Sequence, residues 1–439
     1  MRTAFPGLTR QILALALPAL GALVAEPLFL LADTAIIGHL GVDELAGAGL
    51  GSTVLQTVVG LMIFLAYATT PAVARQFGAG NHARALAAGR DGVWLALLLG
   101  VLLGVLGWVA APALVSALGA HGATAGFAVT YLRVSMAGVP AMLAVLAATG
   151  VLRGLQDGRT PLLVAGLGFI VNAGLNYVLV YGVHLSVAGS ALGTVLAQWG
   201  MAAVYLALLV PRMRAGGVPL RPSASGLRHS AHAGGWLMLR TLSLRVGILA
   251  TVWVATAHGP VTLAAHQLVF TLFSTLAFAL DALAVAAQSL IGKELGAGDV
   301  ARVRALTRTM MRWGVFFGVF TGALLAAVAW VLPALFTRAP DVRSAATAGL
   351  LVLAVSQPVC GLVFVLDGVL IGAEDARYLA LTGVLNLAVY APALAVVALL
   401  PLPGEPLVWV WAAFTVYLVA RGVTLTWRAV RDTWMRVGA

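Results

Sequence analysis

The sequence predicts an all-α integral membrane protein whose twelve transmembrane helices form two pseudo-symmetric six-helix lobes. Two observations lead to this fold class, an apolar composition and an internal repeat. Hydrophobic residues make up 61% of the 439 residues, only 9% are charged, and the mean hydropathy is +1.01. Because a soluble domain cannot bury that much apolar surface, the composition excludes a water-soluble protein.

The internal repeat relates the two halves of the chain at a constant offset of 218 residues. Residues 45–84 lie over residues 263–302 without a gap, and the same offset carries 150–159 onto 368–377. Two matching segments in one register indicate a duplication of the whole half. In an apolar chain, a duplication of this kind is typical of a transporter whose substrate passes between two related halves.

The membrane spans follow from the apolar stretches, because a helix needs about 20 mainly apolar residues to cross a bilayer. We expect spans at roughly 11–37, 46–74, 91–113, 128–152, 161–181, 187–210, 235–257, 262–291, 311–333, 345–371, 378–400 and 406–428. Each half contains an even number of spans, so both halves enter the membrane in the same direction. A pseudo-twofold axis along the membrane normal should therefore relate them.

The domain organisation follows from a polar break in the middle of the chain. Residues 1–210 form the predicted N-lobe and residues 235–439 the C-lobe. The stretch 211–234 between them is rich in Pro, Gly, Ser and Arg, which indicates a cytoplasmic linker. Within the lobes, the segments GAGNHAR and GAGDVAR follow the second and eighth spans. They predict matching inner turns, because glycine permits a sharp reversal of the backbone.

The net charge of +11 reflects membrane topology. With the N-terminus inside, 21 of the 26 Lys and Arg residues fall on the cytoplasmic side, Arg421 among them. This bias predicts a multi-pass protein of the cell (inner) membrane with both termini in the cytoplasm. The same distribution argues against a nucleic-acid partner. The single cysteine, Cys360, excludes an intramolecular disulfide, and no metal-ligand pattern is present.

Several motifs together resemble one known family. The stretch LLADTAIIGHLG at 30–41, VLRGLQDGRTP at 151–161 and FVLDGVLIGAEDARY at 364–378 are similar to the DinF-like branch of the multidrug and toxic compound extrusion (MATE) family. The resemblance covers nearly the whole chain. It implies a V-shaped pair of lobes, alternating access, a working monomer and no cofactor beyond a coupling ion. It also implies export of amphipathic, often cationic, organic compounds driven by an inward proton or sodium gradient.

Two acids of the first span are candidates for proton or cation coupling. Asp33 stands, by the resemblance, at the position of the family's N-lobe coupling aspartate. Burial favours the neutral form of a carboxyl group and a nearby cation favours the charged form, so one site can exchange a proton or Na⁺ for substrate. An aspartate that merely touches the outer interface is the alternative. Glu26 lies two turns away beside Pro27, and it either assists Asp33 or caps hydrogen bonds broken by a proline kink.

Polar residues of later N-lobe spans are expected to line a substrate cavity. Asn172 and Asn176 are four residues apart and therefore share a helix face. By the resemblance, Asn172 matches a cavity asparagine, whereas Asn176 stands where several relatives carry a second aspartate. Asp33 would then titrate alone or with help from Glu26. Thr194 matches a cavity hydroxyl, although an interhelical hydrogen bond would also explain it. Further candidates on the second span are Gln56, Met62 and Tyr67.

The C-lobe is expected to hold charge pairs. Its seventh span lacks the glutamate that NorM-type relatives use and carries Arg240 and Arg245 instead. At 1.5 Å per residue from the inner helix ends, Arg245 lies about 14 Å deep and Asp281 about 18 Å deep. These similar depths predict a buried Arg245–Asp281 pair, and Asp367 is positioned to pair with Arg240. We interpret both pairs as structural or gate-forming.

The sequence thus favours a secondary active efflux antiporter coupled to protons, with Na⁺ as an alternative ion. A lipid-linked precursor flippase of the same superfamily is the first alternative, but its cavity should be strongly cationic, whereas the N-lobe is acidic. An intramembrane transferase is the second. That activity needs clustered acids or a His/Asp pair at one interface, and the chain contains no D-D-x-x-D or H-x-x-x-x-D motif.

Overall fold

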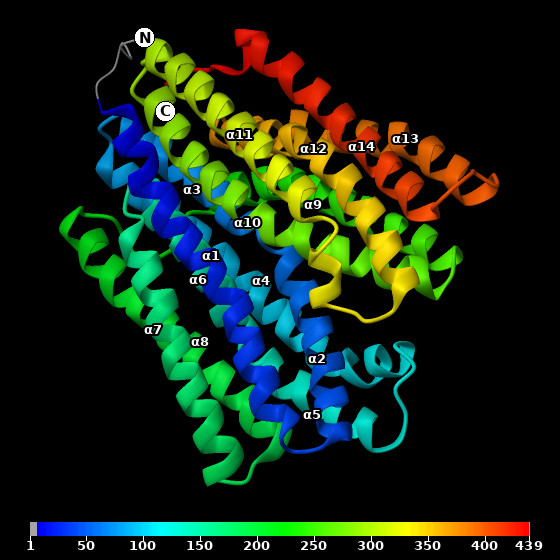
Figure 1. The fold of residues 1–439 in the computed structure, drawn as a ribbon. Helices are drawn as coiled ribbons and strands as arrows, with labels where there is room; N and C mark the ends of the chain where they lie inside the picture. Colours follow the sequence, from blue (N-terminus) through cyan, green and yellow to red (C-terminus); the bar gives the residue numbers. More distant parts are fainter. Residues whose placement is uncertain (1–6, 439) are drawn as a thin grey trace. The chain divides into compact units, whose positions relative to one another are not determined.

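The computed structural model describes residues 7–438, apart from the side chain of Glu26, and all secondary structure in that range is helical (Figure 1). The chain forms two compact units. We call Leu17–Gly234 the N-terminal unit. The C-terminal unit consists of the residues up to Ala16 together with Gly235–Gly438. Two helices therefore pass from one unit into the other, α1 (Leu8–Gly38) after Ala16 and α9 (Ala224–Ala257) after Gly234.

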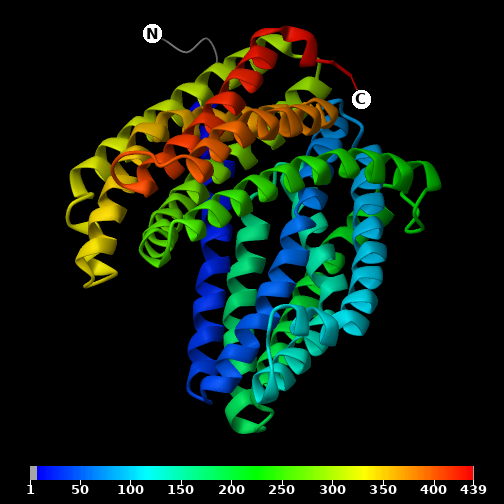
Figure 2. The same ribbon diagram turned by 90° about the vertical axis from the view of Figure 1, so that its right-hand side faces the viewer.

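The N-terminal unit is a bundle of long helices (Figure 2). Besides its parts of α1 and α9 it contains α2 (Val42–Leu61), α3 (Phe64–Gly78), α4 (His82–Ala117), α5 (Gly122–Met136), α6 (Val139–Gly154), α7 (Arg159–Tyr177), the π-helical turn η1 (Val178–Gly182) and α8 (Ser186–Ala215). The C-terminal unit contains α10 (Pro260–Gly296), α11 (Val300–Val328), the 3₁₀ turn η2 (Leu332–Leu335), α12 (Pro340–Gly372), α13 (Ala376–Leu399), α14 (Pro406–Val430) and η3 (Asp432–Trp434).

The predicted membrane spans are confirmed. In the described residues, 11 helices are long and apolar enough to cross a membrane, and the α5/α6 pair, bent by 49°, makes a twelfth. Each expected span corresponds to one of these helices or helix pairs. Several helices extend well past the apolar stretch; α4 begins at His82 and α9 at Ala224. The extensions are polar, so composition marks the membrane-embedded part of a helix and not its ends.

The linker is anchored to the N-terminal unit by a buried ion pair in the third turn of α4. Asp91 accepts hydrogen bonds from the backbone nitrogen of Ser223 at 3.0 Å and from its hydroxyl at 2.9 Å. Arg90 pairs with Asp91 and donates to the carbonyl oxygen of Pro219 at 2.8 Å. Trp94 donates to the carbonyl oxygen of Leu220. The segment between α8 and α9 is therefore bound along its length to α4.

The repeat in the sequence is also a repeat in backbone geometry. Gly80 and Gly298, in the turns that follow α3 and α10, have the same positive φ of 77°. Gln156 and Glu374, again 218 residues apart, are non-glycine residues with φ values of 66° and 60°. Side chains rarely adopt this left-handed region, so its occurrence at equivalent positions indicates two copies of the same turn.

Glycine contacts set the same close helix packing in both units. A Cβ atom at Gly100 of α4 would lie 2.5 Å from the Cα of Pro140 in α6. At the equivalent position of the other unit, a Cβ at Gly318 of α11 would lie 2.7 Å from the Cα of Pro358 in α12. Only glycine allows the backbones to approach this closely, as is common between membrane helices.

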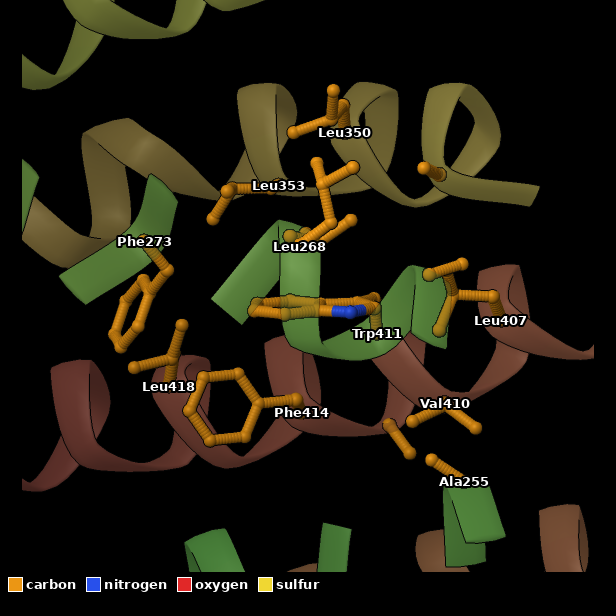
Figure 3. Packing of buried hydrophobic residues seen from close by; sticks show 14 of the residues in the cluster. Ala255, Leu268, Phe273, Leu350, Leu353, Leu407, Val410, Trp411, Phe414 and Leu418 are labelled. Carbon is orange, nitrogen blue, oxygen red and sulfur yellow. The ribbon is translucent and has the colours of Figure 1, made fainter. Parts of the chain in front are cut away.

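Part of the C-terminal unit is filled by an aromatic core (Figure 3). Trp411 of α14 is almost completely buried, and its ring lies 5.4 Å from that of Phe414 and 6.0 Å from that of Phe273 in α10. Leu268 and Leu353 pack in the same cluster. Edge-to-face aromatic pairs of this kind add to the packing of α10, α12 and α14.

Candidate polar site around Asp33

A buried carboxyl group lies among the helices of the N-terminal unit. Asp33 of α1 is only 6% exposed. The amide nitrogen of Asn176 in α7 donates to its Oδ1 at 2.9 Å, and the hydroxyl of Ser190 in α8 donates to the same oxygen. The phenol of Tyr131 in α5 donates to Oδ2 at 3.4 Å. Four helices thus contribute to one site.

The polar network continues from Asp33 along α7 and α8. Asn176 also donates to Oδ1 of Asn172 at 3.2 Å, and Asn172 donates to the hydroxyl of Thr194 at 3.0 Å. All of these side chains are buried. Two i, i+4 pairs, Asn172 with Asn176 and Ser190 with Thr194, face each other across the two helices. The structure therefore brings together Asp33, Asn172, Asn176 and Thr194, four of the residues selected from sequence.

The side chains that contact Asp33 carry no charge. In the described part of the chain, no Arg, Lys or His forms an ion pair with Asp33, so its charge has no fixed counterion. Oδ1 of Asn176 has no hydrogen-bond partner among residues 7–438 and lies against Gly193, where a Cβ atom would be only 2.0 Å away. A hydroxyl can donate or accept, so Ser190 and Tyr131 can bind both the ionised and the neutral carboxyl group.

Sequence reasoning missed Ser190 and Tyr131. Ser190 could have been found, because it lies one turn before Thr194 on the same face of its helix. Tyr131 gave no comparable signal, since a single tyrosine in an apolar span is usually an anchor or a core residue. The backbone carbonyl of Ile36, three residues after Asp33, accepts a hydrogen bond from Tyr181 in the π-helical turn η1. This contact fixes the C-terminal end of α1 against η1.

The other N-lobe candidates lie elsewhere or cannot be placed. The side chain of Glu26 lies outside the described part of the structure. Gln56 is exposed on α2, and Met62 lies at the break between α2 and α3. Tyr67 lies within Coulombic range of Arg153, near the C-terminal end of α6. Within residues 7–438, no group of three or more His, Cys, Asp or Glu side chains could hold a metal ion.

The C-terminal unit holds a charge cluster at a different place. Asp367 of α12 forms ion pairs with Arg240 of α9 and, at 2.6 Å, with Arg421 of α14. The three side chains are 7%, 8% and 9% exposed. Arg240 and Asp367 pair as predicted. Arg421, expected among the cytoplasmic basic residues, is buried in the helix bundle, where it pairs with Asp367.

The predicted Arg245–Asp281 pair is wrong. Arg245 is exposed on α9 and makes no ion pair within the described residues. Asp281 of α10 instead lies within Coulombic range of Arg240, Asp367 and Arg421. Counting helix rise gave similar depths, but five residues of helix turn Arg245 about 140° away from Arg240. Depth alone therefore did not identify the partner.

The two units differ at the positions that correspond to the Asp33 site. At an offset of 218, Thr251 replaces Asp33 and Tyr390 replaces Asn172, and these two hydroxyls share a hydrogen bond of 2.7 Å. Trp411 replaces Gly193 and fills the corresponding space with the aromatic core. The polar site thus belongs to one unit, and the other has an apolar filling there.

Comparisons with known proteins agree with this architecture. The chain matches the MatE family model over residues 18–178 and 239–397, one segment in each half. The DNA damage-inducible protein F of Escherichia coli strain K12 is 30% identical over 427 residues, which cover 94% of this chain and 91% of that protein. The chloroplastic Protein DETOXIFICATION 44 of Arabidopsis thaliana is 30% identical over 381 residues, 81% of this chain and 70% of that protein.

The solved structures show the same fold. The bent form of the Vibrio cholerae MATE transporter VcmN aligns with a TM-score of 0.88 at 20% identity, over 98% of this chain and 97% of that one. A family of transporters excludes the alternative of an intramembrane transferase. Since the family model matches most of both halves, the chain belongs to the MatE family and is a multidrug and toxic compound efflux transporter of the membrane.

Proposed function

We propose that this transporter exports amphipathic cationic compounds in exchange for protons and that Asp33 binds proton and substrate in turn. One observation carries the proposal: the carboxyl group of Asp33 is buried, and its partners Asn176, Ser190 and Tyr131 are all neutral. An ionised Asp33 leaves an uncompensated charge inside the membrane, which is costly. A proton or a cationic substrate offsets that charge, and competition between the two for one group produces antiport.

The composition of the site supports a small number of exchanged ions. Asn176 and Asn172 are amides and do not titrate, so Asp33 is the acid at the centre of the described network. Na⁺ is the alternative coupling ion, because the network also offers neutral oxygen atoms. The bias of basic residues to one side supports an inner-membrane location with both termini in the cytoplasm. The site lies within a single unit of one chain, which supports a working monomer.

The test is transport by purified protein in lipid vesicles. Ethidium movement is followed under an imposed pH gradient and, separately, under an imposed Na⁺ gradient. We expect the pH gradient to drive transport and the variant Asp33→Asn to abolish it. Asp43→Asn is the matched control, because Asp43 is an exposed acid at the start of α2 that bonds Thr124. The proposal fails if Asp33→Asn still couples transport to the pH gradient, and Na⁺-only transport would reassign the ion.

A further inference from the structure

A second carboxyl group within the membrane-spanning part of the chain has no bonded partner among the residues that the structure describes. Asp281 lies in α10, 15 residues before the helix ends at Gly296, which places it about 22 Å along the helix from that end. Its side chain is half-buried. Among the described residues, it makes neither a hydrogen bond nor an ion pair. An acid in such a position is seldom without function.

The nearby acid, Asp367, is bonded on both carboxylate oxygens. Its Oδ2 accepts from Nη2 of Arg240 and from Nη2 of Arg421, and its Oδ1 accepts from Nε of Arg240 at 3.3 Å. Two guanidinium groups therefore balance the charge of Asp367. A proton could reach Asp367 only by displacing these contacts, whereas Asp281 has none to displace.

The charges around Asp281 leave its protonation state open. Asp281 lies within Coulombic range of Arg240 on α9, Asp367 on α12 and Arg421 on α14. The phenol of Tyr417 on α14 lies within Coulombic range of the same three groups. With Asp281 ionised, the four charged groups sum to zero; with Asp281 protonated, they sum to one positive charge. Burial favours the neutral acid, and the guanidinium groups favour the carboxylate. Because these effects oppose each other, a proton can bind and leave.

A small hollow lies beside the ion-paired groups of Arg240, Asp367 and Arg421. It is lined by Arg240, Asp367 and Arg421 together with the polar side chains of Ser243, Thr382 and Asn386. The hollow has room for roughly one water molecule. Such a water can solvate the guanidinium groups when the positive charge is not balanced.

We propose that Asp281 is a second proton-binding site, separate from Asp33, and that its proton is exchanged during transport. The binding of the proton is independent of the proposed function, whereas its exchange during transport rests on the proposed antiport. The site would give the C-terminal unit a proton of its own although that unit lacks the Asp33 network.

The experiment is infrared difference spectroscopy of the full-length protein in lipid, titrated from acid to alkaline pH. The carbonyl stretch of a protonated carboxyl group reports each titrating acid directly. We expect Asp281→Asn to remove one titrating band that Asp33→Asn leaves in place, and Asp281→Glu to restore a band at a shifted frequency. Asp341→Asn is the control, because Asp341 is an exposed acid in the first turn of α12 and should leave the buried bands unchanged.

The outcomes separate this proposal from the proposed function. If Asp281→Asn has the wild-type spectrum at every pH, Asp281 binds no proton and the inference is overturned. The Asp281→Glu variant controls for misfolding, because it keeps a carboxyl group at this position. For the role in transport, we expect Asp281→Asn to lower the number of protons exchanged per ethidium molecule while Asp33→Asn abolishes coupling. An unchanged ratio in Asp281→Asn vesicles overturns that role and leaves the Asp33 proposal intact.

Discussion

Replacement of Asp367 by asparagine tests the charge cluster of the C-terminal unit most directly. The substitution keeps the size of the side chain but removes the negative charge that Arg240 and Arg421 share. Because all three groups are less than 10% exposed, the stranded guanidinium groups have little access to water. Removing one partner of a buried ion pair typically costs about 3–5 kcal/mol. At about 2–4 °C per kcal/mol for a unit of this size, the melting temperature should fall by roughly 6–20 °C.

The assay is thermal unfolding of the purified protein in detergent, with a compensating variant and a surface control. Asp367→Asn combined with Arg421→Gln should recover part of the loss, because one stranded cation is removed. Asp432→Asn should cost less than about 1 kcal/mol, since its pair with Arg304 is exposed. If Asp367→Asn unfolds at the same temperature as Asp432→Asn, the cluster does not stabilise the unit and our reasoning about it is wrong.

Three further predictions test the packing and the linker. Gly193→Ala should impair ethidium export, because the new Cβ would displace Asn176 from Asp33, whereas Gly200→Ala on the same helix meets open space and should export normally; equal rates would contradict this. Gly100→Ala and Gly318→Ala should each destabilise the protein by about 1–3 kcal/mol in the unfolding assay, while Gly126→Ala should not. Asp91→Ala should release the linker and speed tryptic cleavage after the exposed Arg221; an unchanged digestion rate would show that Asp91 does not hold it.

The membrane spans and the duplication could be predicted from sequence because both are patterns along the chain. Apolar length identifies a span, and the offset of 218 predicted turns whose backbone angles match in the two units. The pair Asn172 and Asn176 could be placed on one face by helical periodicity alone. These predictions need no knowledge of which helix packs against which.

The partners of charged and polar groups could not be predicted in the same way. Arg240 and Arg245 lie on one span, and only the packing of α9 against α12 and α14 decides that Arg240 meets Asp367. Ser190 belongs to the site because α8 lies against α7 at that level, which periodicity does not reveal. Burial of Arg421 depends on the packing of α14 against α12, which brings it to Asp367. Each miss concerns contacts between helices.

The matched glycine contacts have a consequence for protein engineering. Gly100 and Gly318 hold their helices against Pro140 and Pro358 in the same way, although the two halves contain different chemistry at positions 33 and 251. One scaffold therefore accepts either a polar or an apolar interior at the same location. The interior of one half could accordingly be redesigned while the helix spacing is kept. The substitutions Thr251→Asp and Leu394→Asn, at the positions equivalent to Asp33 and Asn176, are the natural starting design for a transporter with an ion site in each half.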